Sequence, residues 1–119
     1  MTVLMLGRNL ELALYRAEVL RNAGHMVTIP KDRQEAIAAI HGSAFDVAII
    51  SYTLSSKTVE ELVELLRQKA PQTAIISIAA EGWEDRLIEP DETVLANDGP
   101  RALVAALQRI EAKHIRRIS

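Results

Sequence analysis

Four polar residues have the side-chain chemistry to hold a small anion. Arg8 and Asn9 come just after the first apolar run of the chain, and Ser51 and Thr53 come after a later run. A guanidinium carries a fork of N–H donors, and amide and hydroxyl groups can donate or accept hydrogen bonds beside it. If the two runs are neighbouring strands, these residues predict a site for an anion or a polar metabolite.

Arg8 and Ser51 also have structural interpretations, which we favour. Arg8 can form an ion pair with Glu11, with Asp98 or with a carboxylate in residues 81–85, or it can be a solvated surface arginine. Ser51 can accept a phosphate from a serine kinase, but serine is also a common small residue at strand ends. The anion site therefore stands as the alternative interpretation of this region.

Catalytic and metal chemistry have little support in the sequence. The chain has no cysteine, which excludes disulfides, thiolate metal sites and cysteine nucleophiles. Its three histidines, His25, His41 and His114, lack the spacing of metal ligands. No order of serine, histidine and aspartate suggests a triad, and there is neither a dinucleotide fingerprint nor a Walker sequence. We therefore expect no enzymatic activity, no metal and no cofactor.

Trp83 is the only tryptophan in a chain whose aromatic content is 3%. It stands among charged residues, and an aromatic side chain in such a setting is typical of an anchor in a protein–protein interface. The alternative is a lid that folds over the edge of the sheet. The two interpretations of Trp83 are evenly balanced.

The composition is that of a single globular domain. The 119 residues include 49% hydrophobic and 25% charged residues, and the formal net charge is -2. This balance does not indicate binding to nucleic acid or to a membrane, and no apolar run approaches membrane-spanning length. The absence of cysteine suits a reducing cytoplasm. We assign residues 1–112 to the domain and residues 113–119 to a basic helical tail, which can lead to an output domain outside this chain.

Two apolar patterns alternate along the chain and predict the elements that must position these residues. Short apolar runs suit strands that are buried on both faces, and apolar residues at helical spacing lie between them. Asn9 is expected to cap the first helix, Asp32 with Glu35 the second, and Thr58 with Glu61 forms a capping box for the third. The expected strands cover residues 3–6, 26–29, 47–50, 74–79 and 94–96, and the helical stripes are Leu10 to Leu20, Ala36 to Ile40, Val59 to Leu66 and Ala102 to Ile110.

Strands that alternate with helices predict an α/β fold with a doubly wound, five-stranded parallel sheet and right-handed crossovers. Sites in such sheets form outside the carboxyl ends of the strands. The segments to inspect are therefore residues 7–9, 51–53, 78–80 and 97–98.

At this level the chain resembles the receiver domains of bacterial response regulators. The resemblance extends to about Ile110 and is carried by Val3–Leu6 as the first strand, the Gly24–His25 turn into the second, and Phe45–Ile50 as the third. It implies a flavodoxin-like (βα)5 fold and a role in two-component phosphorelay signalling.

The residues that carry out phosphoryl transfer in that family are absent here. The two acidic residues that hold Mg²⁺ correspond to Gly7 and Arg8, and the phosphoacceptor aspartate corresponds to Ser51. The responsive threonine or serine corresponds to Ile78, and the lysine to Asn97. Mg²⁺ needs oxygen ligands, and an acyl phosphate needs a carboxylate nucleophile. The resemblance therefore implies a degenerate pseudo-receiver.

Two details qualify this correspondence. A shift of one residue would place Ser77 instead of Ile78 at the threonine position. The segment between Ala79 and Asn97 is about five residues shorter than the family pattern, so we expect the fourth helix, over residues 81–88, to be short or irregular. The usual dimer face of the family includes that helix, so the usual dimer is in doubt.

The leading hypothesis is a non-catalytic receiver-like domain that acts through protein–protein contacts and without aspartyl phosphorylation. Its partner is a protein or an output domain of unknown identity, a homodimer stays open, and no direct contact with nucleic acid or membrane is expected. The alternative is a sensor that binds a small ligand or an anion near Arg8, Asn9, Ser51 and Thr53.

Overall fold

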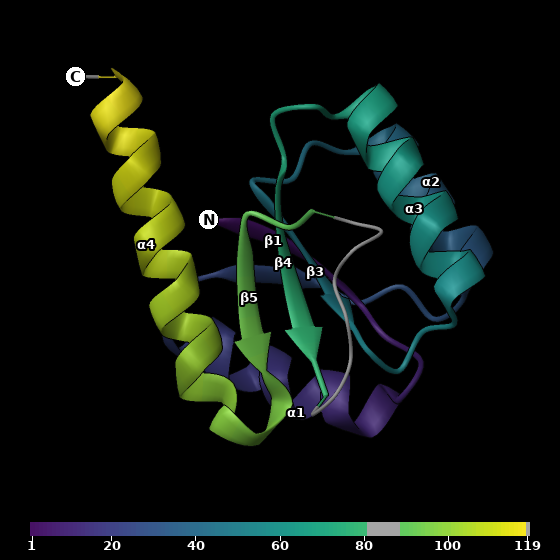
Figure 1. Ribbon diagram of the computed structural model, residues 1–119, viewed down its shortest axis with the longest axis horizontal. Helices are drawn as coiled ribbons and strands as arrows, with labels where there is room; N and C mark the ends of the chain where they lie inside the picture. Colours follow the sequence, from purple (N-terminus) through teal and green to yellow (C-terminus); the bar gives the residue numbers. More distant parts are fainter. Residues whose placement is uncertain (81–88, 119) are drawn as a thin grey trace.

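The computed structural model describes residues 1–80 and 89–118, with side chains as far as Lys113. Strands and helices alternate as the sequence predicts (Figure 1). The elements are β1 (Thr2–Leu6), α1 (Leu10–Asn22), β2 (Met26–Thr28), α2 (Arg33–Gly42), β3 (Val47–Ser51), α3 (Ser56–Lys69), β4 (Ala74–Ala79), β5 (Glu92–Leu95), the 3-10 turn η1 (Ala96–Asp98) and α4 (Pro100–Ile118).

The strands form one parallel sheet in the order β2-β1-β3-β4-β5. The register pairs Leu6 with Ile50, Ser51 with Ile78, and Ala79 with Leu95. The ends of β1, β3, β4 and β5 therefore meet at one edge, as the predicted α/β fold requires.

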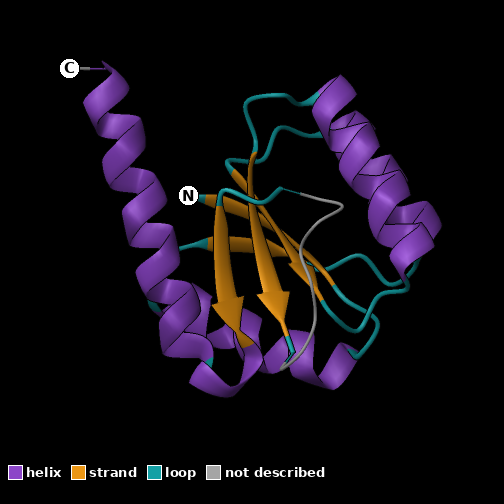
Figure 2. Cartoon of the chain, viewed as in Figure 1, coloured by secondary structure: helices purple, strands orange, loops and turns teal. Residues whose placement is uncertain are grey.

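The two faces of the sheet are covered by different helices (Figures 1 and 2). Helices α1 and α4 pack on one face, and α2 and α3 pack on the other. The side chains of β3 alternate between them: Val47 and Ile49 face α1 and α4, whereas Ala48 and Ile50 face α2 and α3. All of β3 is buried, which explains its uninterrupted apolar run.

Two of the three predicted helix caps are confirmed. The Asn9 side chain accepts a hydrogen bond from the Leu12 amide, and the Asp32 side chain accepts one from the Glu35 amide. The predicted capping box of Thr58 with Glu61 is wrong.

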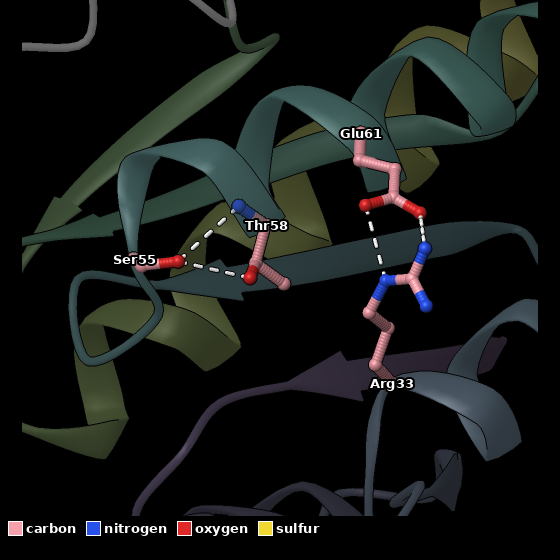
Figure 3. Close-up of polar contacts among 4 residues, drawn as sticks. All are labelled: Arg33, Ser55, Thr58 and Glu61. Atoms are coloured by element: carbon pink, nitrogen blue, oxygen red, sulfur yellow. Dashed lines mark hydrogen bonds and ion pairs between the residues drawn. The ribbon is translucent and has the colours of Figure 1, made fainter.

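Helix α3 begins one turn earlier than predicted, because Ser55 is its cap and accepts a hydrogen bond from the Thr58 amide (Figure 3). The Ser55 hydroxyl also donates to the Thr58 hydroxyl at 2.9 Å. The carboxylate of Glu61 is thereby available to Arg33 of α2, whose guanidinium donates to both of its oxygens (Figure 3).

The second half of helix α4 forms ion pairs with the edge strand β5. Arg109 Nε lies 2.7 Å from Glu92 Oε1, and Lys113 Nζ lies 3.5 Å from Glu92 Oε2.

The predicted fourth helix, over residues 81–88, falls outside the described residues. Within the part of the chain that is described, no helix is long and apolar enough to cross a membrane.

Candidate functional site

Ser51 lies at the carboxyl edge of the sheet and is the acceptor in a network of hydrogen bonds. The amide and the hydroxyl of Thr53 donate to Ser51 Oγ at 3.3 and 3.1 Å. The Arg8 amide donates to Thr53 Oγ1 at 2.9 Å, which joins the loop after β1 to the loop after β3. Ser51 is 3% exposed. Its hydroxyl is thus used by the fold and is closed to solvent.

Gly7 allows this close approach of the two loops. A Cβ atom on Gly7 would lie 3.3 Å from Ser51 Cβ and 3.4 Å from Thr53 Oγ1. The first distance is tighter than most side-chain contacts and the second is an ordinary close contact, so a side chain at residue 7 would require Ser51 to shift by a few tenths of an ångström. The loops after β1 and β3 are therefore closely packed at Gly7.

The remaining polar side chains of the predicted anion site do not converge on a ligand. The Asn9 side chain is occupied by the cap of α1. The Arg8 side chain is exposed, and among the described residues no carboxylate pairs with it, neither Glu11 nor Asp98. The predicted pairing with residues 81–85 lies outside the described residues.

The other residues predicted for this edge are divided between the two faces. Ile78 is buried and pairs in register with Ser51, on the face covered by α1 and α4. Ser77 is fully buried and pairs with Ile50, whose side chain faces α2 and α3. Ile78 is therefore the β4 residue beside Ser51. Asn97 is exposed in η1, and Trp83 lies outside the described residues.

Arg16 is the buried charged residue of the described part of the chain, and the apolar sequence pattern does not predict it. Its side chain is 7% exposed, and its Nη1 lies 3.5 Å from Ser51 Oγ. Burial lowers the pKa of the Arg16 guanidinium, and the interaction with the nearby Tyr52 phenol opposes this effect. No described carboxylate accompanies the buried charge.

A spacing signal for Arg16 was present in the sequence. Ala13, Arg16, Ala17 and Leu20 stand at i, i+3, i+4 and i+7, and they are the buried residues of α1. The predicted stripe instead followed the apolar residues and included Leu10 and Leu14, which are about half exposed. The buried face of α1 therefore includes Arg16 and leaves Leu10 and Leu14 at its margin.

Next to Arg16 a pocket of about 210 Å³ opens between α1, the ends of β4 and β5, and the start of α4. Apolar groups from α1 and the strands form most of its wall. Its lining residues are Leu12, Tyr15, Arg16, Ile78, Val94, Leu95, Ala96, Gly99, Pro100 and Leu103.

This edge of the sheet offers hydroxyls, apolar walls and one buried cation. Among the residues with described positions, no group of three histidine, cysteine, aspartate or glutamate side chains is placed to hold a metal ion. Nucleophilic attack on a phosphoryl group needs an exposed, activated nucleophile. The buried Ser51 hydroxyl does not meet that requirement.

No protein-family model and no curated protein sequence matches the chain. Solved structures do match. The chemotaxis protein CheY4 of Vibrio cholerae is 21% identical, with a TM-score of 0.77 over 92% of this chain and 97% of that chain. A CheY-like response regulator receiver domain of Methanospirillum hungatei is 17% identical, with a TM-score of 0.80 over 97% of both chains. A third similar structure is the response regulator TrrA of Thermotoga maritima in complex with Mg²⁺-BeF, 15% identical, with a TM-score of 0.75 over 92% of this chain and 97% of that chain.

These comparisons confirm the predicted fold, since the chain has the CheY-like, flavodoxin-like fold of response regulator receiver domains. At this level of identity the likeness concerns the fold alone.

Proposed function

We propose that this chain is a receiver-like signalling module that works without aspartyl phosphorylation and without catalysis, through contacts with a protein partner or an output domain. The observation that carries the proposal is the closed edge of the sheet. Gly7 brings two loops together over Ser51, whose hydroxyl already accepts hydrogen bonds from Thr53 and Arg16. A metal and a phosphoryl group would need carboxylates and space at this edge.

The charge at this edge supports the same proposal. Phosphoryl transfer through an acyl phosphate uses carboxylates to hold the metal and to attack. Here the residue nearest to Ser51 from α1 is a buried cation, Arg16, and the exposed side chain after β1 is also a cation, Arg8. Two positive side chains oppose the binding of Mg²⁺ in their neighbourhood.

Beryllofluoride with Mg²⁺ provides the direct test. We expect amide NMR spectra and the sedimentation coefficient of this chain to be unchanged by Mg²⁺ and beryllofluoride together, and acetyl phosphate to leave the mass unchanged. TrrA of Thermotoga maritima, which forms a complex with Mg²⁺-BeF, serves as the positive control under the same conditions. A saturable, Mg²⁺-dependent shift of the Gly7, Ser51 and Thr53 amides would overturn the proposal.

The alternative function, an anion sensor built on Arg8, Asn9, Ser51 and Thr53, is the weaker candidate. Asn9 caps α1, and the hydroxyls of Ser51 and Thr53 bond to each other. Only the exposed Arg8 side chain is left to attract an anion, and one solvated arginine binds weakly. A phosphate or sulfate titration that shifts these four amides, and that is lost in Arg8→Met, would restore the alternative.

The cytoplasm and a two-component pathway are the setting that we infer for this module, because its fold is that of receiver domains and its composition suits a reducing compartment. The net charge of -2 argues against direct binding to nucleic acid by this domain.

A further inference from the structure

Arg16 and the adjoining pocket together have the features of a ligand site that is distinct from the closed edge at Ser51. A buried guanidinium is energetically costly unless an opposite charge accompanies it. Arg16 is 7% exposed and has only neutral oxygen partners among the described residues, namely Ser51 Oγ at 3.5 Å and the Tyr52 phenol. Five N–H donors belong to a guanidinium, so two neutral acceptors leave most of its hydrogen-bonding capacity for another group.

The pocket offers a path to this charge from outside. Arg16 is the charged residue among the lining residues, and the half-exposed Tyr15 and Leu95 border the pocket on the side of the solvent. The rest of the wall is apolar, chiefly Ile78, Val94 and Leu103. A ligand must therefore combine a negative group with an apolar body.

The start of α4 provides a second source of positive potential for an anion. Gly99 and Pro100 line the pocket, and Pro100 is the first residue of this 19-residue helix. The positive end of the helix dipole is directed toward this region and stabilises negative charge there. The dipole and the guanidinium thus act from neighbouring walls of the same pocket.

We propose that this pocket binds a small monocarboxylate with a short apolar chain, and that Arg16 pairs with its carboxylate. A carboxylate accepts two parallel hydrogen bonds from one guanidinium, which matches the donors that Arg16 has left. A dry cavity of about 150 Å³ accommodates benzene, so a pocket of about 210 Å³ has room for roughly three to six carbon atoms. The ligand class follows from this size together with the apolar wall.

Isovalerate is a suitable probe, with isovaleramide as its neutral counterpart of the same shape. We expect isovalerate to raise the melting temperature and to shift the amides of Arg16, Ala96 and Leu103 in a saturable manner, because a ligand that binds the native state stabilises it. Isovaleramide is expected to bind at least about tenfold more weakly, since it lacks the charge that Arg16 recognises.

Two variants separate the charge from the pocket. Arg16→Met removes the cation, and Ala96→Leu fills space from the wall while Arg16 is retained; each should weaken isovalerate binding by about tenfold or more. Arg8→Met is the matched control, because it removes an exposed arginine near the same edge and should bind isovalerate as the wild type does.

Several results would overturn the inference: no saturable binding of isovalerate at millimolar concentration, equal binding of isovaleramide, or unchanged binding in both Arg16→Met and Ala96→Leu. If Arg16→Met does not fold, Ala96→Leu and the amide still decide the question. The inference goes beyond the proposed signalling function, and although both use Arg16, their failures are distinguishable: a response to beryllofluoride would overturn the proposed function, whereas the isovalerate results decide the pocket.

Discussion

The two faces of the sheet differ in the side chains that they bury. On the face covered by α2 and α3, the described core holds no charged side chain; Ser77 is its buried polar residue, and the Ser55 cap and the pair between Arg33 and Glu61 lie at the surface. On the face covered by α1 and α4, a charged side chain, Arg16, enters the interior beside a pocket. The second arrangement therefore leaves a buried charge beside a pocket, which the first does not.

This difference places the buried charge and the pocket on one side of a single sheet. The same strands contribute to both faces, with Ile50 and Ile49 as neighbours in β3 that point in opposite directions. A buried charge without an opposite partner lowers stability, and structures usually retain such a feature for a reason other than stability. We therefore expect substitutions on the two faces to have different consequences.

The largest effect should come from core truncation, and it should be larger on the α2/α3 face. Leu62→Ala removes a side chain that is 2% exposed in a closed core and should cost about 3–4 kcal/mol. Leu103→Ala, equally buried on the other face, should cost about 2–3 kcal/mol, because its side chain already borders a pocket and the new cavity opens into it. Urea unfolding at equilibrium measures both. Equal losses would mean that the α1/α4 face is packed as tightly as the other.

Arg16→Met should have the opposite sign. Methionine can follow the same path as the arginine side chain and removes a buried charge that no described carboxylate pairs with. Replacement of buried charges by apolar residues is often neutral or stabilising, so we expect a gain of 0 to about 2 kcal/mol. Arg8→Met, at an exposed site, should stay within about 0.5 kcal/mol of the wild type. A clear loss of stability in Arg16→Met would show that the contacts with Ser51 and Tyr52 outweigh the burial of the charge.

Ser55→Ala tests the cap of α3 and should have a smaller effect, a loss of about 1 kcal/mol. The loss arises because the Thr58 amide would have no side-chain acceptor. Thr58→Val is the matched comparison: it keeps the amide and removes the hydroxyl that the structure places as a partner of Ser55, so it should cost less. If Thr58→Val is the more damaging of the two, the helix begins at Thr58 and the cap at Ser55 is wrong.

The same two regions show which features the sequence can predict. Short apolar runs predict the strands and their burial on both faces. The predicted strand positions agree with the structure to within a few residues. Ser55 and Thr58 both stand before the same apolar stripe, and either residue type can cap a helix. Only the structure shows that Ser55 is the cap of α3. Capping by residue type alone does not fix the first turn.

Arg16 was missed for a different reason. Charged residues are rarely buried, so the apolar pattern predicts a buried stripe through Leu10 and Leu14 and leaves Arg16 out. The burial of Arg16 depends on contacts with Ser51 and Tyr52, which lie more than 30 residues away along the chain. Similarly, the closing of the edge at Gly7 depends on the register between β1 and β3. Such contacts between distant segments are not contained in a local pattern.

The smallest effect should come from the surface pair of α2 and α3. The hydrogen bond and charge of Arg33 lower the pKa of Glu61 below its ordinary value of 4.5. A lowered carboxylate pKa contributes stability above the unfolded-state pKa, and this contribution is lost as the pH falls through the folded-state value. The wild type should therefore lose its small advantage over Glu61→Gln as the pH falls below the ordinary value of 4.5 and through the lowered folded-state pKa, and 1 M NaCl should reduce that advantage at neutral pH, because exposed charges are screened. Thermal unfolding of both proteins across this range measures the difference. A difference that neither acid nor salt reduces would mean that Glu61 contributes through packing and not through its charge.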